Sequence, residues 1–197
     1  MPDTVIGISA ELRGGKGTCV KILETIFHGD TSVISSGMIL TDLAMAFERP
    51  DPTNRKTLQD CFSRAQKALG RRCLHSGIRE RWEESKKRIW IFDGVLMPWD
   101  VEFIRSFPQN ILFFVDCKIE TRYKRARLAA LCQEADAKPD EAKITLEEFK
   151  KMHEHETAKF VATIKNLSAV RVLDNNGTIK ELGSQIKLIL ANTGWQI

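Results

Sequence analysis

Short apolar runs rich in β-branched and aromatic residues recur along the chain, and longer stretches with helical spacing separate them. Five of these runs have the length and composition of buried strands, at residues 4–9, 31–35, 88–92, 111–116 and 169–173. Strands that alternate with helices are typical of a parallel sheet covered on both faces. The pattern therefore predicts an α/β fold built on one five-stranded parallel sheet.

The helical stretches carry their own start and stop signals. One helix shows apolar residues at helical spacing and is followed by Gly70, a predicted C-terminal stop. Its apolar positions are Leu58, Cys61, Phe62, Ala65 and Leu69. Two capping boxes, Thr145 with Glu148 and Thr178 with Glu181, predict the starts of two later helices.

Composition indicates one globular domain over residues 1–197, because 43% hydrophobic and 28% charged residues are ordinary for a folded chain. The five cysteines are widely spaced without a C-x-x-C pair, which favours free thiols in a reducing compartment. We find no leader-like start and no apolar run near the roughly 18 residues of a membrane span. These features predict a cytoplasmic protein without a membrane partner, and they leave the oligomeric state open.

The net charge of +4 is spread along the chain, with acidic and basic residues interspersed. A long block of one sign, which would favour a nucleic-acid partner, is absent from the sequence. The excess of positive charge therefore fits a site for anionic phosphates better than a nucleic-acid surface.

The most specific motif follows the first predicted strand, where residues 10–18 read Ala-Glu-Leu-Arg-Gly-Gly-Lys-Gly-Thr before a helical pattern. Glycines let backbone N–H groups curl round phosphates, the helix N-terminus adds a positive dipole end, and a lysine reaches the β- and γ-phosphates. The motif predicts an ATP site with Thr18 as a Mg²⁺ ligand. Its residues are Arg13, Gly14, Gly15, Lys16, Gly17, Thr18 and Cys19.

Two positions depart from the usual phosphate loop. Ala10 stands where the first glycine is expected, and Glu11 would bring a negative charge to a polyphosphate unless its side chain points away. The alternative interpretation is a glycine-rich turn that binds no ligand.

The form Gly-Lys-Gly-Thr at 15–18 resembles the loop of adenylate kinases and related P-loop nucleoside monophosphate kinases. Residues 33–40 resemble the strand and turn that open their acceptor region, and 92–95 resemble their third strand and its Asp-Gly end. Residues 173–178 resemble the last strand and loop of dephospho-coenzyme A kinases. The resemblance implies a three-layer P-loop NTPase fold with strand order 2-3-1-4-5, an acceptor-binding arm at 36–88 and a short lid at 128–145.

The resemblance also implies roles for single residues. Asp93 ends an apolar strand at the carboxyl edge of the sheet, where it would hold Mg²⁺ through water or orient the acceptor; the alternative is a turn cap before Gly94. Arg122 and Arg125 share a helix face and would clamp the transferring phosphoryl group, unless that face is merely solvated. Asn176 would contact ATP.

The acceptor site is less well marked. The candidates for acceptor contacts are Ser36, Gly37, Arg49, Arg55 and Arg79. Leu96 stands where the related kinases place an arginine that grips the acceptor phosphate. Another basic residue therefore replaces it, or the acceptor site is more apolar, or transfer has been lost.

Two further features receive plain interpretations. His153 and His155 lie two residues apart, so on a helix they point in different directions and favour a polar surface over a metal site. The four tryptophans are widely spread, which favours packing over a base-stacking platform, and they are Trp82, Trp90, Trp99 and Trp195.

The sequence thus predicts an ATP- and Mg²⁺-dependent kinase that moves the γ-phosphoryl group to a nucleotide or nucleotide-like small molecule. A (deoxy)nucleoside monophosphate ranks first among acceptors and dephospho-coenzyme A second. A nucleotide-binding switch with little transfer activity is the alternative from another functional class.

Overall fold

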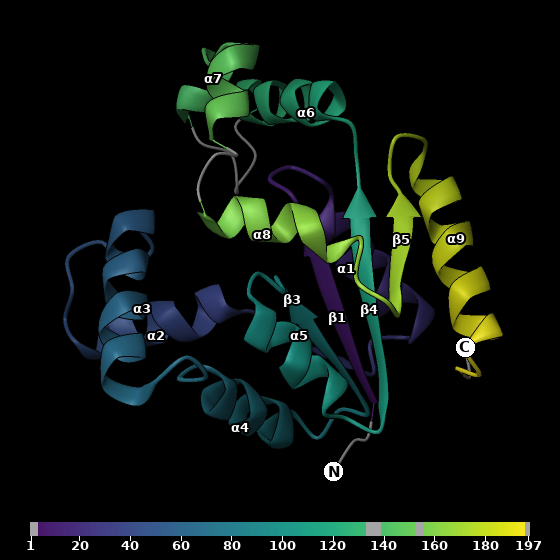
Figure 1. Ribbon diagram of the computed structural model, residues 1–197, viewed down its shortest axis with the longest axis horizontal. Helices are drawn as coiled ribbons and strands as arrows, with labels where there is room; N and C mark the ends of the chain where they lie inside the picture. The colour runs from purple at the N-terminus through teal and green to yellow at the C-terminus, as the bar shows by residue number, and fades with distance from the viewer. Residues whose placement is uncertain (1–3, 133–138, 153–155, 196–197) are drawn as a thin grey trace.

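The computed structural model describes residues 4–132, 139–152 and 156–195, and a five-stranded parallel sheet stands at its centre (Figure 1). The order is β2-β3-β1-β4-β5, and each neighbouring pair is parallel. The strands are β1 (Thr4–Ala10), β2 (Thr31–Ile34), β3 (Ile89–Asp93), β4 (Gln109–Asp116) and β5 (Val170–Asp174). All five predicted strands and their expected order are confirmed, with only small differences at the ends.

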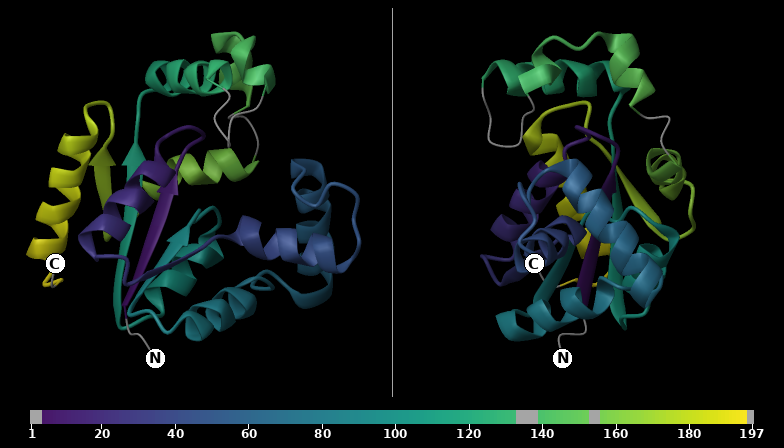
Figure 2. Two further views of the ribbon diagram at one scale, coloured as in Figure 1. Left: turned by 180° about the vertical axis from the view of Figure 1, so that it is seen from behind. Right: turned by 90° about the vertical axis from the view of Figure 1, so that its left-hand side faces the viewer.

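Helices cover both faces of the sheet and give the fold its three layers (Figures 1 and 2). On one face α1 (Lys16–Ile26) packs against α9 (Ile179–Asn192) over a core that includes Leu23 and Ile186. On the other face α5 (Pro98–Arg105) and α8 (Glu156–Ile164) contact the central strands. Because both faces of β1, β3 and β4 are largely buried, these strands carry long apolar runs, whereas β5 at the edge of the sheet exposes Arg171 and Val172.

The segment between β2 and β3, expected to be the acceptor-binding arm, folds as three helices at one side of the sheet (Figure 1). They are α2 (Ser36–Ala46), α3 (Arg55–Leu69) and α4 (His75–Ser85). As predicted, α3 ends before Gly70, which has a φ of 85°. A side chain at that φ would be strained, so glycine suits the turn into the next helix.

The region after β4 lies beyond the carboxyl ends of the strands (Figures 1 and 2). It contains α6 (Ile119–Leu131), the 3₁₀ helix η1 (Pro139–Ala142) and α7 (Leu146–Lys151). Part of the expected lid, residues 133–138, lies outside the described residues, as do His153 and His155. Both predicted capping boxes form, at the start of α7 and at the start of α9.

Tryptophans join the arm to the sheet. Trp82 of α4 is fully buried and stacks on Trp90 of β3 with ring centroids 5.0 Å apart. Its Nε1 donates a hydrogen bond of 3.1 Å to the carbonyl of Ser32, so its polar atom is satisfied. Trp195 is also buried, whereas Trp99 is half-buried and faces a cavity described below. Among the helices of the described residues, none is long and apolar enough to cross a membrane.

We predict that Trp82→Ala lowers the free energy of unfolding by roughly 3–5 kcal/mol, because it leaves a large void and removes the stacked contact with Trp90. Urea denaturation followed by far-UV circular dichroism measures the change. Glu83→Ala, at the neighbouring exposed position, is the control and should stay within about 0.5 kcal/mol of the wild type. Equal stability of the two variants would contradict the burial of Trp82.

Candidate functional site

A sharp glycine turn joins β1 to α1. The Gly14 N–H donates to the Glu11 carbonyl at 2.9 Å, and Gly15 has a φ of 102° just before the helix begins at Lys16. A Cβ on Gly14 would lie 2.9 Å from both the Glu11 carbonyl oxygen and the Ala10 Cβ, which is too close. The turn therefore requires glycine at both positions, and it leaves the N-terminus of α1 facing the carboxyl edge of the sheet.

Lys16, at the start of α1, lies close to Asp93, at the end of β3. Their Nζ and Oδ1 atoms lie 3.9 Å apart, since β1 pairs with β3 and Asp93 ends that strand. The Asp93 Oδ1 atom is buried and accepts no hydrogen bond from any described residue. A buried carboxylate oxygen with this unmet capacity is suited to a cation or to water bound to one.

The residues present fit Mg²⁺, which prefers oxygen ligands and keeps several waters when it binds substrate phosphates. Thr18, in the first turn of α1, and Asp93 are the protein groups that would hold it. Within the described ranges no group of three or more His, Cys, Asp or Glu side chains is placed to hold a metal by itself. The ion would therefore take most of its ligands from phosphates and water.

Cys19 stays uncharged beside this site. Burial, and to a smaller extent the nearby Asp93 carboxylate, raises the pKa of its thiol to about 12. Its backbone N–H donates to the Gly15 carbonyl at 3.1 Å and so begins the helical pattern. The thiol thus brings no negative charge close to a bound polyphosphate.

Arg122 holds the glycine turn from α6. It is 3% exposed and donates from Nε to the Cys117 carbonyl at 3.0 Å and from Nη1 to the Leu12 carbonyl at 3.2 Å. Its Nη2 lies 3.2 Å from the Glu11 carboxylate. This ion pair neutralises the negative charge of Glu11, one of the two departures from the usual phosphate loop. The burial of Arg122 also shows that it is not on a solvated helix face.

Arg125, three residues after Arg122 on α6, also reaches the glycine turn. Its Nη2 donates to the Asn175 carbonyl at 2.9 Å, and its Nη1 lies 3.7 Å from the place that a Cβ on Gly15 would take. Arg127 turns away and lies over the Tyr123 ring at 5.8 Å. The predicted shared face of Arg122 and Arg125 therefore exists and faces the glycine turn.

A further contact joins the turn to the segment after α6. Arg13 has a φ of 59°, and its Nη2 lies 2.5 Å from the Glu141 carboxylate, which is almost fully buried in η1. The expected lid segment therefore touches the glycine turn through a charged pair.

Asn175 is the asparagine that contacts the glycine turn, and Asn176, which was expected to contact ATP, is exposed beside it. The Asn175 Nδ2 donates to the Gly14 carbonyl at 2.8 Å, and its backbone N–H donates to the Asp116 carbonyl at 2.8 Å. The Asn176 side chain instead accepts from the Lys118 N–H at 2.9 Å and donates to Asp174. Sequence analysis missed Asn175 because nothing in an Asn-Asn pair says which residue turns inward.

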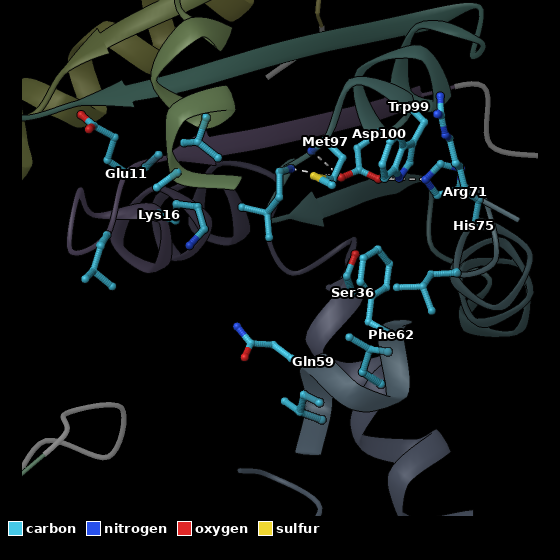
Figure 3. Close-up of a pocket in the computed structure, with 18 of the residues that line it drawn as sticks. Glu11, Lys16, Ser36, Gln59, Phe62, Arg71, His75, Met97, Trp99 and Asp100 are labelled. Carbon is cyan, nitrogen blue, oxygen red and sulfur yellow. Dashed lines mark hydrogen bonds and ion pairs between the residues drawn. The ribbon is translucent and has the colours of Figure 1, made fainter. Parts of the chain in front are cut away.

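A cavity of about 570 Å³ opens between Lys16 and the arm (Figure 3). Most of its lining is apolar and comes from α2, α3, α8 and the segment after β3. The apolar lining includes Leu40, Leu58, Phe62, Leu74, Leu96, Met97, Trp99, Met152, Ala158 and Val161. The polar groups at its wall are Glu11, Lys16, Ser36, Gln59, Arg71, His75 and Asp100.

The expected acceptor residues are divided by the fold. Ser36 lines this cavity, while Gly37 borders a separate shallow pocket and Arg49 lines a cavity of about 650 Å³ between the arm helices. The Arg79 guanidinium lies 5.2 Å from the Phe107 ring centre. Arg55 begins α3, and its side chain is not among those described.

Within the part of the chain that the structure describes, Arg71 lines the cavity as a second cation besides Lys16, and sequence analysis did not single it out. Its signal in the sequence is weak, because an arginine after a helix stop is common on protein surfaces. Its position depends on how the turn between α3 and α4 sits against the segment after β3.

That segment is fixed by a buried carboxylate. One oxygen of Asp100 accepts hydrogen bonds from the Leu96 and Met97 N–H groups at 3.1 and 3.0 Å. The other lies 2.9 Å from the His75 Nε2, and the His75 ring stacks on Phe103 at 4.3 Å. Leu96 and Met97 therefore stand in a fixed position in the cavity wall.

Comparisons with known proteins bear on the fold. No protein-family model and no curated protein matches the chain. Among solved structures, TT1252 from Thermus thermophilus has 14% identity and a TM-score of 0.60, covering 96% of this chain and 97% of its own. Shikimate kinase from Bacteroides thetaiotaomicron has 12% identity and a TM-score of 0.61, with the same shares covered. At such identity the likeness shows the fold, and it confirms the expected P-loop kinase fold.

We predict that Asn175→Ala weakens ATP binding by about tenfold, because the Gly14 carbonyl loses its buried donor and such a loss costs roughly 1–3 kcal/mol. Titration calorimetry with ATP and Mg²⁺ gives the dissociation constant. Asn176→Ala, which removes only exposed hydrogen bonds, is the matched variant and should change the constant less than threefold. A larger effect at Asn176 than at Asn175 would show that the neighbouring asparagine contacts ATP directly.

Proposed function

We propose that this chain is an ATP-dependent phosphotransferase that moves the γ-phosphoryl group of Mg-ATP to a nucleotide acceptor, with a (deoxy)nucleoside monophosphate as the first choice. One observation carries the proposal: Lys16 belongs both to the glycine turn and to the wall of the 570 Å³ cavity. Phosphoryl transfer needs the γ-phosphate and the acceptor to meet in line. Lys16 borders both the glycine turn, which would hold ATP, and the cavity, which would hold the acceptor. It therefore lies where the two ligands would meet.

The proposed roles follow from these positions. The backbone N–H groups of Gly15 and Gly17 and the N-terminus of α1 hold the triphosphate, and Lys16 contacts its β- and γ-phosphates. Bound at Thr18 and Asp93, Mg²⁺ supplies positive charge to the phosphate oxygens. An oxygen of the acceptor phosphate forms the new bond to the γ-phosphorus while the bond to the bridging oxygen breaks. The products are ADP and a nucleoside diphosphate.

The two arginines of α6 that face the glycine turn are assigned different roles in the transfer step. Arg122, with its guanidinium engaged by Cys117, Leu12 and Glu11, positions the loop. Arg125 is half-buried beside Gly15 and is the better placed of the two to face the charge that develops on the transferred group. Both are therefore assigned to the transfer step, one directly and one through the loop.

A second candidate function is a nucleotide-binding switch that transfers phosphoryl groups poorly. The observation that favours it is Leu96, which lines the cavity at the place where the related kinases have an arginine. An apolar side chain cannot supply the charge-assisted hydrogen bonds that an acceptor phosphate needs.

If the chain is a kinase, dephospho-coenzyme A is the second choice among acceptors.

We predict that Lys16→Ala keeps the fold, weakens ATP binding and lowers phosphoryl transfer roughly hundredfold or more, because it removes a cation from the transferring phosphates. Calorimetry and transfer from γ-labelled ATP give the two readouts, and circular dichroism checks the fold. Lys21→Ala, an exposed lysine on the same helix, is the control with wild-type values expected. Wild-type binding and transfer in the Lys16 variant would remove the basis for an ATP site here.

A screen of acceptors separates the two candidate functions. We expect γ-labelled phosphate to pass to at least one nucleoside monophosphate in a panel of ribose and deoxyribose forms that also contains dephospho-coenzyme A. Tight ATP binding with no labelled product across the panel would replace the kinase by the switch.

A further inference from the structure

We propose that Arg71 and Trp99 form a base-reading subsite at the end of the cavity away from Lys16, and that this subsite selects a guanine-type base over adenine. The inference rests on the proposed function, in that it takes the cavity to hold a nucleotide acceptor. It assigns the part of that acceptor that the cavity discriminates.

Lys16 and Arg71, the Lys and Arg side chains that line the cavity among the described residues, lie at opposite ends of it (Figure 3). Lys16 is at the glycine turn, whereas Arg71 lies beside Trp99, with its guanidinium carbon 5.9 Å from the ring centre. The Arg71 backbone sits in a tight turn, since the Cys73 N–H donates to the Gly70 carbonyl at 3.2 Å. Apolar side chains, Phe62 and Leu96 among them, line the space between.

This arrangement decides which part of a nucleotide reaches Arg71. The acceptor phosphate must lie near Lys16, because the γ-phosphoryl group that it receives is held there. In a nucleoside monophosphate the base is at the other end of the molecule from the phosphate. Arg71 therefore faces the base, and the apolar middle of the cavity receives the sugar and one side of the ring.

Arg71 has donors to offer. Among the described residues no hydrogen bond or ion pair is made by its guanidinium, and its contact with Trp99 is through the ring face. A guanidinium carries five N–H donors and no acceptor. The half-buried rings of Trp99 and Phe62 add surfaces against which a planar base can stack.

The paired N–H donors of the Arg71 guanidinium favour guanine over adenine. Guanine presents two adjacent acceptors, O6 and N7, which an arginine binds with two parallel hydrogen bonds. Adenine presents its N6 amino donor beside N7, so one of the two donors of the fork would meet another donor. A cavity of about 570 Å³ is within the size range of small-molecule sites and leaves room for a purine.

The test compares Arg71→Ala with Arg72→Ala. Arg72 is the matched control, because its side chain is 68% exposed and its guanidinium pairs with Glu102 on the surface at 2.7 Å. Calorimetry without ATP gives the affinities for GMP, IMP and AMP, of which IMP differs from AMP by a 6-oxo group in place of the amino group. We expect GMP and IMP to bind the wild type at least tenfold more tightly than AMP. Arg71→Ala should remove that preference, and Arg72→Ala should keep it.

A conservative variant distinguishes base reading from simple attraction of an anion. Arg71→Lys keeps the charge but loses the planar fork, so its preference for GMP over AMP should be smaller than that of the wild type if Arg71 reads the O6 and N7 edge. The intrinsic fluorescence of Trp99, isolated by comparison with Trp99→Phe, should change on GMP binding in the wild type.

Three outcomes would overturn the proposal. The first is an equal loss of GMP and AMP affinity in Arg71→Ala, which would indicate a phosphate contact. The second is that Arg71→Ala and Arg72→Ala bind the three nucleotides with the same affinities. The third is a GMP preference in Arg71→Lys as large as that of the wild type. Because binding is measured without ATP, a base preference that depends on Arg71 can be observed even if no phosphoryl group is transferred. Conversely, transfer without such a preference would support the kinase and reject the subsite.

Discussion

The hydrogen bond from Asn175 to the Gly14 carbonyl is the contact on which the geometry of the site depends most directly. A turn that binds phosphate must direct its N–H groups toward the anion, so its carbonyl oxygens need other donors. Asn175 supplies one, at 2.8 Å, and Arg122 supplies another to the Leu12 carbonyl. The turn is thus held from its carbonyl side by residues more than a hundred positions along the chain, which leaves its N–H side for a ligand.

The sheet explains why such distant residues can meet there. β1 lies between β3 and β4, and β4 pairs with β5, so the ends of four parallel strands stand in a row. The Asn175 N–H donates to the Asp116 carbonyl and continues the ladder between β4 and β5 by one residue. The register of β4 and β5 therefore sets the position of the Asn175 side chain, and the buried apolar residues of β4, with Leu173 of β5, keep that register from slipping.

The sequence predicted those parts of the molecule that depend on local patterns. Buried strands are apolar runs, capping boxes are pairs three residues apart, and the glycine turn needs residues without a Cβ at fixed places. Contacts that depend on tertiary packing could not be predicted in this way. Asn175 and Asn176 are identical in type and differ only in which way the strand end turns. Arg71 reaches the cavity because the turn after α3 is carried there by the arm helices, and no local pattern records that.

The segment after Asp93 forms a fixed part of the cavity wall, to which Leu96 and Met97 contribute. Its first two N–H groups beyond Val95 are bound by one oxygen of Asp100, and the other oxygen is bound to His75 of α4. A buried carboxylate with all of these partners is well satisfied, whereas removal of any one would leave a polar group unmet in an apolar setting. The same contact joins the arm to α5, which packs on the sheet, since His75 belongs to α4 and Asp100 to α5. Leu96 can therefore serve as a fixed apolar surface, and in the function proposed above the discrimination between bases belongs to Arg71 and Trp99.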